Sequence, residues 1–114
     1  MRKFKFDYDS GNDDLFLFRS DSKSKGGVEI GGKIVLDFNG NRELVGIEIL
    51  DASEMLSELA NVRQEFAPVL KSLKECRVDV HEKAGVTIIK MLFVSGKSEE
   101  VPTMLTIPSI SKHK

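Results

Sequence analysis

The sequence predicts an α+β protein. We expect an antiparallel sheet of six to seven strands that can curl like a barrel, with one kinked helix or helix pair between the first four strands and the last three. Apolar and polar residues alternate along most of the chain, which is the period-two pattern of half-buried strands. Residues 52–73 show helical spacing instead, and clusters of Gly, Asn, Asp and Ser separate the segments as turns.

The first third of the chain contains strands only. Segment 3–8 alternates apolar and polar residues, and a turn at 9–13 separates it from segment 15–18. Segment 15–18 is apolar on both faces, which predicts an inner strand. From Val28 to Phe38 apolar residues recur at even-numbered positions, on both sides of Gly31-Gly32. Because the glycine pair does not shift this alternation, it predicts a bend or a bulge in one strand.

In the middle of the chain a strand leads into a helix. The strand is expected over Leu44–Leu50, after a hairpin turn at Asn39-Gly40. Asp51 and Glu54 have the spacing of a capping box, so the Asp51 side chain should accept from the first helical N–H groups. Pro68 predicts a kink or a restart near its position. An apolar stripe is expected at Met55, Leu59, Val62 and Phe66.

Three more strands are predicted after the helix, over residues 76–81, 86–94 and 101–107. Pro102 and Pro108 place the last of them at a sheet edge, because proline cannot donate to a ladder. The length fits a single α+β domain over residues 1–108, followed by a flexible tail at 109–114.

Composition narrows the classes of function. The 17 basic and 18 acidic residues give a formal charge of −1, which argues against nucleic acid and anionic membranes as partners. Cys76 is the only cysteine, so an intramolecular disulfide is excluded. The N-terminus has no continuous apolar segment of the kind found in signal peptides, which predicts a cytoplasmic protein. No glycine-rich phosphate loop leads into the helix, and no cofactor is expected.

Two segments resemble the motifs of a small prokaryotic family of unknown function. Tyr8–Leu17 is similar to its Tyr-Asp-x-x-x-Asp-x-Leu-Tyr-Ile motif, with Phe16 where the family has tyrosine. Val45–Ser53 is similar to its Val-Gly-Ile-Glu-Ile-Leu-x-Ala-Ser motif. The resemblance covers roughly residues 4–60, so residues 61–114 form an extended C-terminal half. It supports the predicted fold and implies no activity.

Clustered carboxylates could in principle hold a hard cation. Asp7, Asp9, Asp13 and Asp14 begin like a calcium loop, but Asn12 stands where the turn requires glycine, and Phe18 where the bidentate Glu is required. A turn with side-chain-to-backbone hydrogen bonds is therefore the favoured interpretation. The alternative function is a small metal-dependent hydrolase or metal-binding protein, whose candidate carboxylates are Asp9, Asp13, Asp37 and Glu48.

Glu48 is the carboxylate with the clearest functional alternative. It lies in an otherwise apolar strand and could be a general base with a raised pKa, with Asp37 as its partner across the hairpin. The favoured interpretation is an exposed cross-strand partner of a Lys or Arg. No catalytic, cofactor-binding or metal-binding residue is assigned.

Surplus apolar residues point to an interaction domain. Successive side chains of a strand point to opposite faces of the sheet, and these residues lie on the face opposite the one already expected to be buried. Either the sheet curls around them or another subunit covers them. The leading prediction is a non-enzymatic binding or protein-interaction domain, a homodimer that associates through an apolar sheet face or edge. The residues expected to mediate association are Phe16, Phe18, Ile89, Met91 and Phe93.

Overall fold

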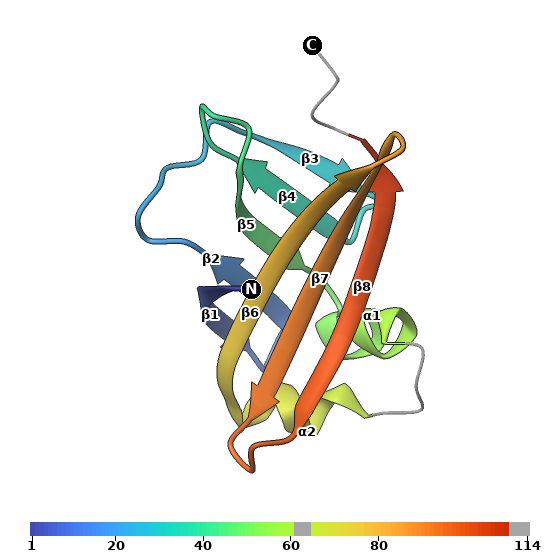
Figure 1. The fold of residues 1–114 in the computed structure, drawn as a ribbon. Coiled ribbons are helices and arrows are strands. Elements are labelled where there is room, and N and C mark those ends of the chain that lie inside the picture. The colour runs from blue at the N-terminus through green and yellow to red at the C-terminus, as the bar shows by residue number, and fades with distance from the viewer. Residues whose placement is uncertain (61–64, 110–114) are drawn as a thin grey trace.

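The computed structural model describes residues 1–60 and 65–109 of the chain. Over these residues eight antiparallel strands form one sheet that curls into a half-barrel, and two short helices lie at one end (Figure 1). The order in the sheet is β3-β4-β5-β2-β1-β6-β7-β8. The elements are β1 (Arg2–Asp9), β2 (Asp14–Phe18), β3 (Gly26–Ile30), β4 (Ile34–Phe38), β5 (Leu44–Ile49), α1 (Ala52–Leu59), α2 (Phe66–Lys71), β6 (Leu73–Lys83), β7 (Val86–Ser95) and β8 (Glu100–Pro108).

Strand β1 joins the two halves of the sheet. It pairs with β2 from Lys5 to Asp9, and with β6 from Arg2 to Phe4. The first half therefore consists of β3, β4, β5 and β2, and the second of β6, β7 and β8. Strand β8 lies at the edge of the sheet, as its two prolines predict.

The strand count differs from the prediction because of the glycine pair. Gly31 and Gly32 have φ of 61° and 72°, and Lys33 N–H donates to the Ile30 carbonyl at 3.3 Å. Two consecutive residues with positive φ form a tight hairpin turn that glycine adopts without strain. Residues 28–38 therefore form the hairpin β3–β4, and the predicted bend or bulge in a single strand is wrong.

The helical segment is a pair, which is one of the two predicted forms. Helix α1 ends at Leu59 and α2 begins at Phe66, with Pro68 in the first turn of α2, where a missing N–H costs no helical hydrogen bond. Val62 of the predicted apolar stripe lies outside the described residues. None of the helices in the described ranges has the length and apolar character needed to cross a membrane.

The core lies on the concave side of the half-barrel. The side chains of Leu15, Leu36 and Ile47 from the first half are completely or almost completely buried there. The helices fill the space at one end between the two halves, where Phe66 of α2 meets Phe93 of β7 edge to face, with ring centroids 5.8 Å apart. The opposite end, near the β6–β7 turn, has no helix (Figure 1).

The C-terminal end of the described chain is fixed rather than loose at Ser109. Ser109 N–H donates to the Gly85 carbonyl at 2.8 Å, and its side chain is buried. The other residues of the predicted tail, 110–114, lie outside the described residues.

Candidate functional site

The first cluster of interest joins the β1–β2 turn to the start of α1. The Asp13 carboxylate accepts hydrogen bonds from the Tyr8 hydroxyl at 2.6 Å, the Ser53 backbone N–H at 3.1 Å and the Ser53 hydroxyl at 2.6 Å. The Asp13 carbonyl accepts another bond from the Ala52 N–H at 2.9 Å. Asp13 therefore satisfies the exposed N–H groups of the first helical turn, although Ser53 is 40 residues away in the sequence.

The predicted capping box at Asp51 and Glu54 is wrong for a conformational reason. Asp51 precedes α1 with left-handed backbone angles, φ 50° and ψ 49°, and its side chain makes no capping hydrogen bond. A capping side chain needs an extended backbone to reach the first N–H groups. The Asp51 carboxylate instead forms an ion pair with Lys33 from the β3–β4 turn.

The protonation states of this cluster suit a structural role. Burial, and then the contact with Asp13, raise the pKa of Tyr8 to about 12. Burial also acts to raise the pKa of Asp13, but hydrogen bonds from Ser53 and Tyr8 outweigh it and hold that pKa below its ordinary value. Tyr8 is then a neutral donor and Asp13 a charged acceptor whose lone pairs are largely occupied.

Asp9 forms the turn that the sequence favours over a calcium loop. Its carboxylate accepts from the backbone N–H groups of Gly11 at 3.0 Å and Asn12 at 3.2 Å, and from the Asn12 side-chain amide at 2.8 Å. The hydrogen bonds from Asn12 lower the pKa of Asp9. These bonds occupy the carboxylate within its own turn.

The four candidate carboxylates do not converge. Asp9 and Asp13 flank the β1–β2 turn, whereas Asp37 and Glu48 lie on neighbouring strands β4 and β5. In residues 1–60 and 65–109, no group of three or more His, Cys, Asp or Glu side chains is placed to hold a metal ion. The described structure therefore gives the metal-dependent alternative no coordination site.

Glu48 lies among other carboxylates on the convex side of the sheet. Burial, then Asp14, then Asp37 raise its pKa above the ordinary glutamate value. Asp14 Oδ1 is buried and accepts no hydrogen bond from the described residues. A protonated Glu48 could donate to Asp14, which two charged carboxylates cannot do. Glu48 thus has carboxylate neighbours, and among residues 1–60 and 65–109 it forms no ion pair with a basic residue.

Glycine lets the Asp37 side chain lie flat on this surface. A Cβ atom at Gly46 would be 3.0 Å from Asp37 Oδ2 and 3.4 Å from the Phe16 ring, and one at Gly27 would be 2.8 Å from Asp37 Oδ1. The Asp37 carboxylate therefore occupies the space that side chains at Gly27 on β3 and Gly46 on β5 would fill.

Phe16 and Phe18 of β2 form a stacked pair on the same side, with ring centroids 5.1 Å apart. Phe16 is 37 % exposed, and its neighbours across the strands are Asp7 and Glu48. Phe18 lies between Lys5 and Gly46. We call this surface the Phe16–Phe18 face; it comprises Lys5, Asp14, Phe16, Phe18, Asp37, Gly46 and Glu48.

The other three residues predicted to mediate association lie inside the molecule. Ile89 and Met91 are 1 % exposed and Phe93 is completely buried, because their side chains point to the concave side of β7. The curled sheet covers them, so they contact no partner in the described fold. The intervening residues Ile88 and Leu92 are partly exposed instead.

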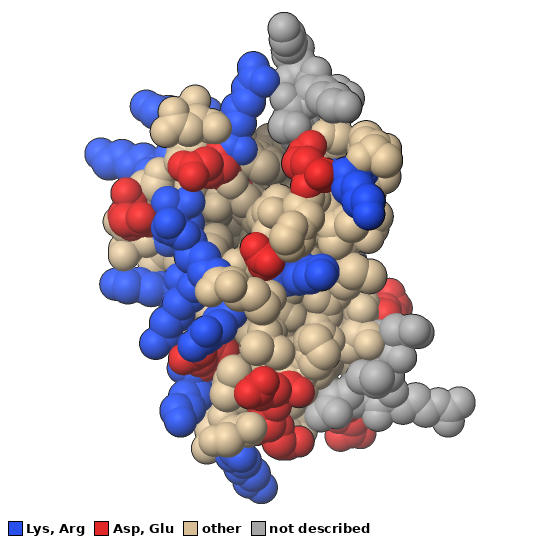
Figure 2. Space-filling model, in the orientation of Figure 1, with Lys and Arg blue, Asp and Glu red and all other residues tan. Residues whose placement is uncertain are grey.

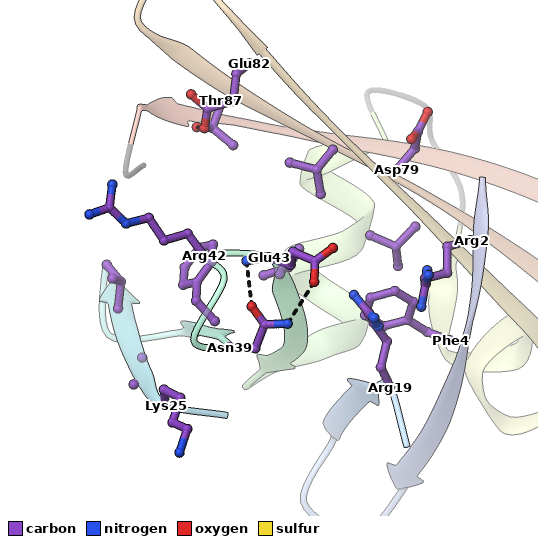
Figure 3. Close-up of a pocket in the computed structure, with 17 residues that line it drawn as sticks. Arg2, Phe4, Arg19, Lys25, Asn39, Arg42, Glu43, Asp79, Glu82 and Thr87 are labelled. Atoms are coloured by element: carbon purple, nitrogen blue, oxygen red, sulfur yellow. Dashed lines mark hydrogen bonds between the residues drawn. The ribbon is translucent and has the colours of Figure 1, made fainter. Parts of the chain in front are cut away.

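A cleft that the sequence analysis did not predict opens at the end of the half-barrel without helices. It has a volume of about 650 Å³ and lies between the β6–β7 hairpin on one side and β3 with the β4–β5 turn on the other (Figure 3). Val28 of β3 and Val80 of β6 line it. In the sequence, the alternation pattern indicates only that these two valines face inward. The cleft itself could not be predicted, because its walls are formed by segments far apart in the chain.

Basic residues surround one side of this cleft. Arg19 and Arg2 both donate to the Asp21 carboxylate, Arg19 through Nε at 3.0 Å and Nη2 at 3.2 Å, and Arg2 through Nη1 at 3.1 Å. The hydrogen bond from Arg19 contributes most to lowering the pKa of Asp21 to about 2. Lys25 and Arg42 also line the cleft.

The basic side chains continue outside the cleft. Figure 2 shows Lys and Arg gathered in a column along one side of the molecule. A second hollow of about 620 Å³ contains several of them and shares Arg2 and Arg19 with the cleft. Basic residues that are dispersed in the sequence thus come together in space; those lining the second hollow are Arg2, Lys3, Lys5, Arg19 and Lys74.

Comparisons with known proteins agree with the resemblance found in the motifs. Residues 5–53 match the model of a family described as a protein of unknown function, DUF2283. An uncharacterised protein of Methanocaldococcus jannaschii is 42 % identical over 55 residues, which are 48 % of this chain and 47 % of that protein. A Methanosarcina mazei protein with the provisional name hypoxanthine phosphoribosyltransferase is 34 % identical over 87 residues, 76 % of this chain and 66 % of that protein. The chain thus spans about half to two thirds of these relatives, and no solved structure matches it.

Proposed function

We propose that the chain, whose residues 5–53 match the DUF2283 family model and whose remaining strands complete the half-barrel, is a non-enzymatic interaction domain that self-associates. The contact we propose is the Phe16–Phe18 face of two copies. The single observation that carries this proposal is the stacked phenylalanine pair on the convex surface of an inner strand, in which Phe16 is exposed and Phe18 partly buried. Aromatic side chains are enriched in the cores of protein interfaces.

One pair of opposite charges on this face, Lys5 and Asp37, could meet across a two-fold axis. Lys5 on β1 lies on one side of Phe18, and Gly46 with Asp37 lies on the other side. A two-fold axis parallel to β2 would place Lys5 of one copy opposite Asp37 of the other. Gly46 keeps the surface flat beside the rings, so two faces can approach closely.

The oligomeric state tests the proposal. We expect a dimer at tens of micromolar by sedimentation equilibrium. The variant Phe16→Glu should shift it to monomer, because it places a charge at the centre of the contact. Met104→Glu is the matched control, since Met104 is 52 % exposed on β8 at the sheet edge. A monomeric wild type, or equal dissociation of both variants, would show that this face does not mediate association.

The name of the Methanosarcina relative supports no transfer of activity to this chain. Phosphoribosyl transfer requires contacts to phosphate groups, which proteins often bind at a glycine-rich loop leading from a strand into a helix. The segment that leads from β5 into α1, Leu50-Asp51, contains no glycine and is not such a loop. We therefore propose no enzymatic reaction.

A further inference from the structure

We infer that the cleft between the two halves of the sheet binds a small amphipathic anion, a molecule with an apolar body and a terminal carboxylate or phosphate. The first argument is apolar exposure. Val28 and Val80 belong to the inward parity of their strands, yet they are 36 % and 39 % exposed. Inward apolar residues of a curled sheet are normally covered, so these two line a space that the protein itself leaves open.

The size of the space suits a small molecule. Its volume of about 650 Å³ falls within the roughly 300–1,000 Å³ of typical ligand sites. Phe4, Leu44 and Val78 form its floor, and all three are buried core residues, so the floor belongs to the rigid part of the fold. A ligand lying on this floor would cover Val28 and Val80 from solvent.

Four basic and three acidic side chains line the cleft, and the two arginines among the basic ones, Arg2 and Arg19, hold N–H donors that an anion could use. The Arg2 and Arg19 guanidiniums share one carboxylate, Asp21, which takes three of their N–H donors, whereas each guanidinium carries five. The Arg19 side chain is only 10 % exposed, so its position is fixed by packing as well as by Asp21. Lys25 makes no ion pair with any residue that the structure describes. Donors are therefore in excess on this side.

The carboxylates that line the cleft are already engaged. Glu43 accepts from the Asn39 side-chain amide at 2.9 Å, Glu82 accepts from the Thr87 hydroxyl at 2.7 Å, and Asp79 contacts the His81 ring at 2.9 Å. Figure 3 shows Glu43 and Asn39 near the centre of the view, and Glu82 and Thr87 at its top. An added oxyanion would find the N–H donors of Arg2 and Arg19 that Asp21 does not take.

Calorimetric titration of the full chain tests this inference with four probes, each used below its micelle-forming concentration. The probes are decanoate, decyl phosphate, decanol and decyltrimethylammonium. We expect the two anions to bind at least about tenfold more tightly than decanol, which corresponds to roughly 1.4 kcal/mol, and the cation not to bind. The ratio of the dissociation constants of decanoate and decyl phosphate distinguishes a carboxylate site from a phosphate site. Equal affinity for decanol would overturn the anionic part, and binding of none of the four would overturn the site.

Two variants locate the binding. Val80→Glu should abolish anion binding, because it places a carboxylate on the apolar wall at an exposed position. Arg2→Gln should weaken it severalfold, because it removes guanidinium donors that Asp21 does not take. Met104→Glu and Lys97→Gln are the matched controls outside the cleft, and thermal melts confirm that all four variants fold. If the controls lose as much affinity as the cleft variants, the anion binds elsewhere. The dimer test on Phe16→Glu is separate, so either proposal can fail alone.

Discussion

At the scale of single residues, Asp13 explains why two distant motifs belong together. Tyr8 and Asp13 come from the first motif and Ser53 from the second, and the three side chains form one hydrogen-bonded cluster. The cluster fixes the β1–β2 turn against the start of α1. The polar residues of the motifs that meet here therefore have a structural role, and a chemical role is not required to explain them.

We expect Asp13→Asn to destabilise the protein by about 1–3 kcal/mol at pH 7, the cost of leaving the partly buried donors of Tyr8 and Ser53 without a charged acceptor. The folded-state pKa of Asp13 lies below its ordinary value, so its contribution is present above the unfolded pKa and is lost as the pH falls through the folded value. Urea unfolding of the wild type and Asp13→Asn, at pH 7 and at acidic pH, measures this contribution to the free energy of unfolding.

The difference in unfolding free energy between the wild type and Asp13→Asn should therefore shrink on acidification. Asp7→Asn is the control, because Asp7 makes no ion pair or hydrogen bond with the residues that the structure describes, and we expect it to change stability by less than about 0.5 kcal/mol. A difference for Asp13→Asn that stays constant with pH would contradict the assigned role of its charge.

Glu48 shows how far the sequence could define the second candidate site. Its place in an apolar strand suggested a raised pKa, and the structure supplies the causes, burial together with Asp14 and Asp37. Asp37 could be named from the hairpin register. Asp14 could not be named as a neighbour of Glu48 from the sequence. It lies near Glu48 only because β2 pairs with β5, and two other strands separate β2 and β5 in the sequence.

At the scale of elements, local patterns predicted what local interactions determine. The Asn39–Glu43 turn, the edge position of β8 and the helix restart before Pro68 all follow from rules that act within a few residues. The start of α1 could not be predicted from local rules. Asp13 caps it from the β1–β2 turn, and the local candidate, Asp51, has the wrong backbone conformation. Tertiary contact overrode a local signal there.

The flat surface across β4 and β5 gives a prediction for strand packing. We expect Gly46→Ala to destabilise the protein by about 1–3 kcal/mol, because the new methyl group would lie 3.0 Å from the Asp37 carboxylate and force it to move. Gly26→Ala on β3 is the matched control, since a Cβ there meets nothing within 4 Å. Guanidinium unfolding of both variants measures the difference; equal effects would show that close approach at Gly46 is not what glycine provides.

At the scale of the whole molecule, the cleft depends on how the two halves of the sheet curl toward each other. Arg19, Lys25 and Arg42 lie in or beside connections of the first half, and Val80 lies in the second half. No spacing in the sequence reports the distance between such segments. The cleft could therefore be found only from the fold, although its apolar residues could be recognised by their parity.

Because β1 pairs with both halves of the sheet, we expect them to unfold as one cooperative unit, and Phe4 is the residue that tests this. Phe4 is buried where β1 pairs with β6, one residue before its pairing with β2 begins. We expect Phe4→Ala to cost about 3–5 kcal/mol and to speed amide hydrogen exchange in β2 and β6 together. Val101→Ala, a buried truncation at the edge strand β8, should affect the second half more than the first. If Phe4→Ala left exchange in β2 unchanged, the halves would be independent, and the cleft between them would then be a boundary between two units instead of a fixed part of one.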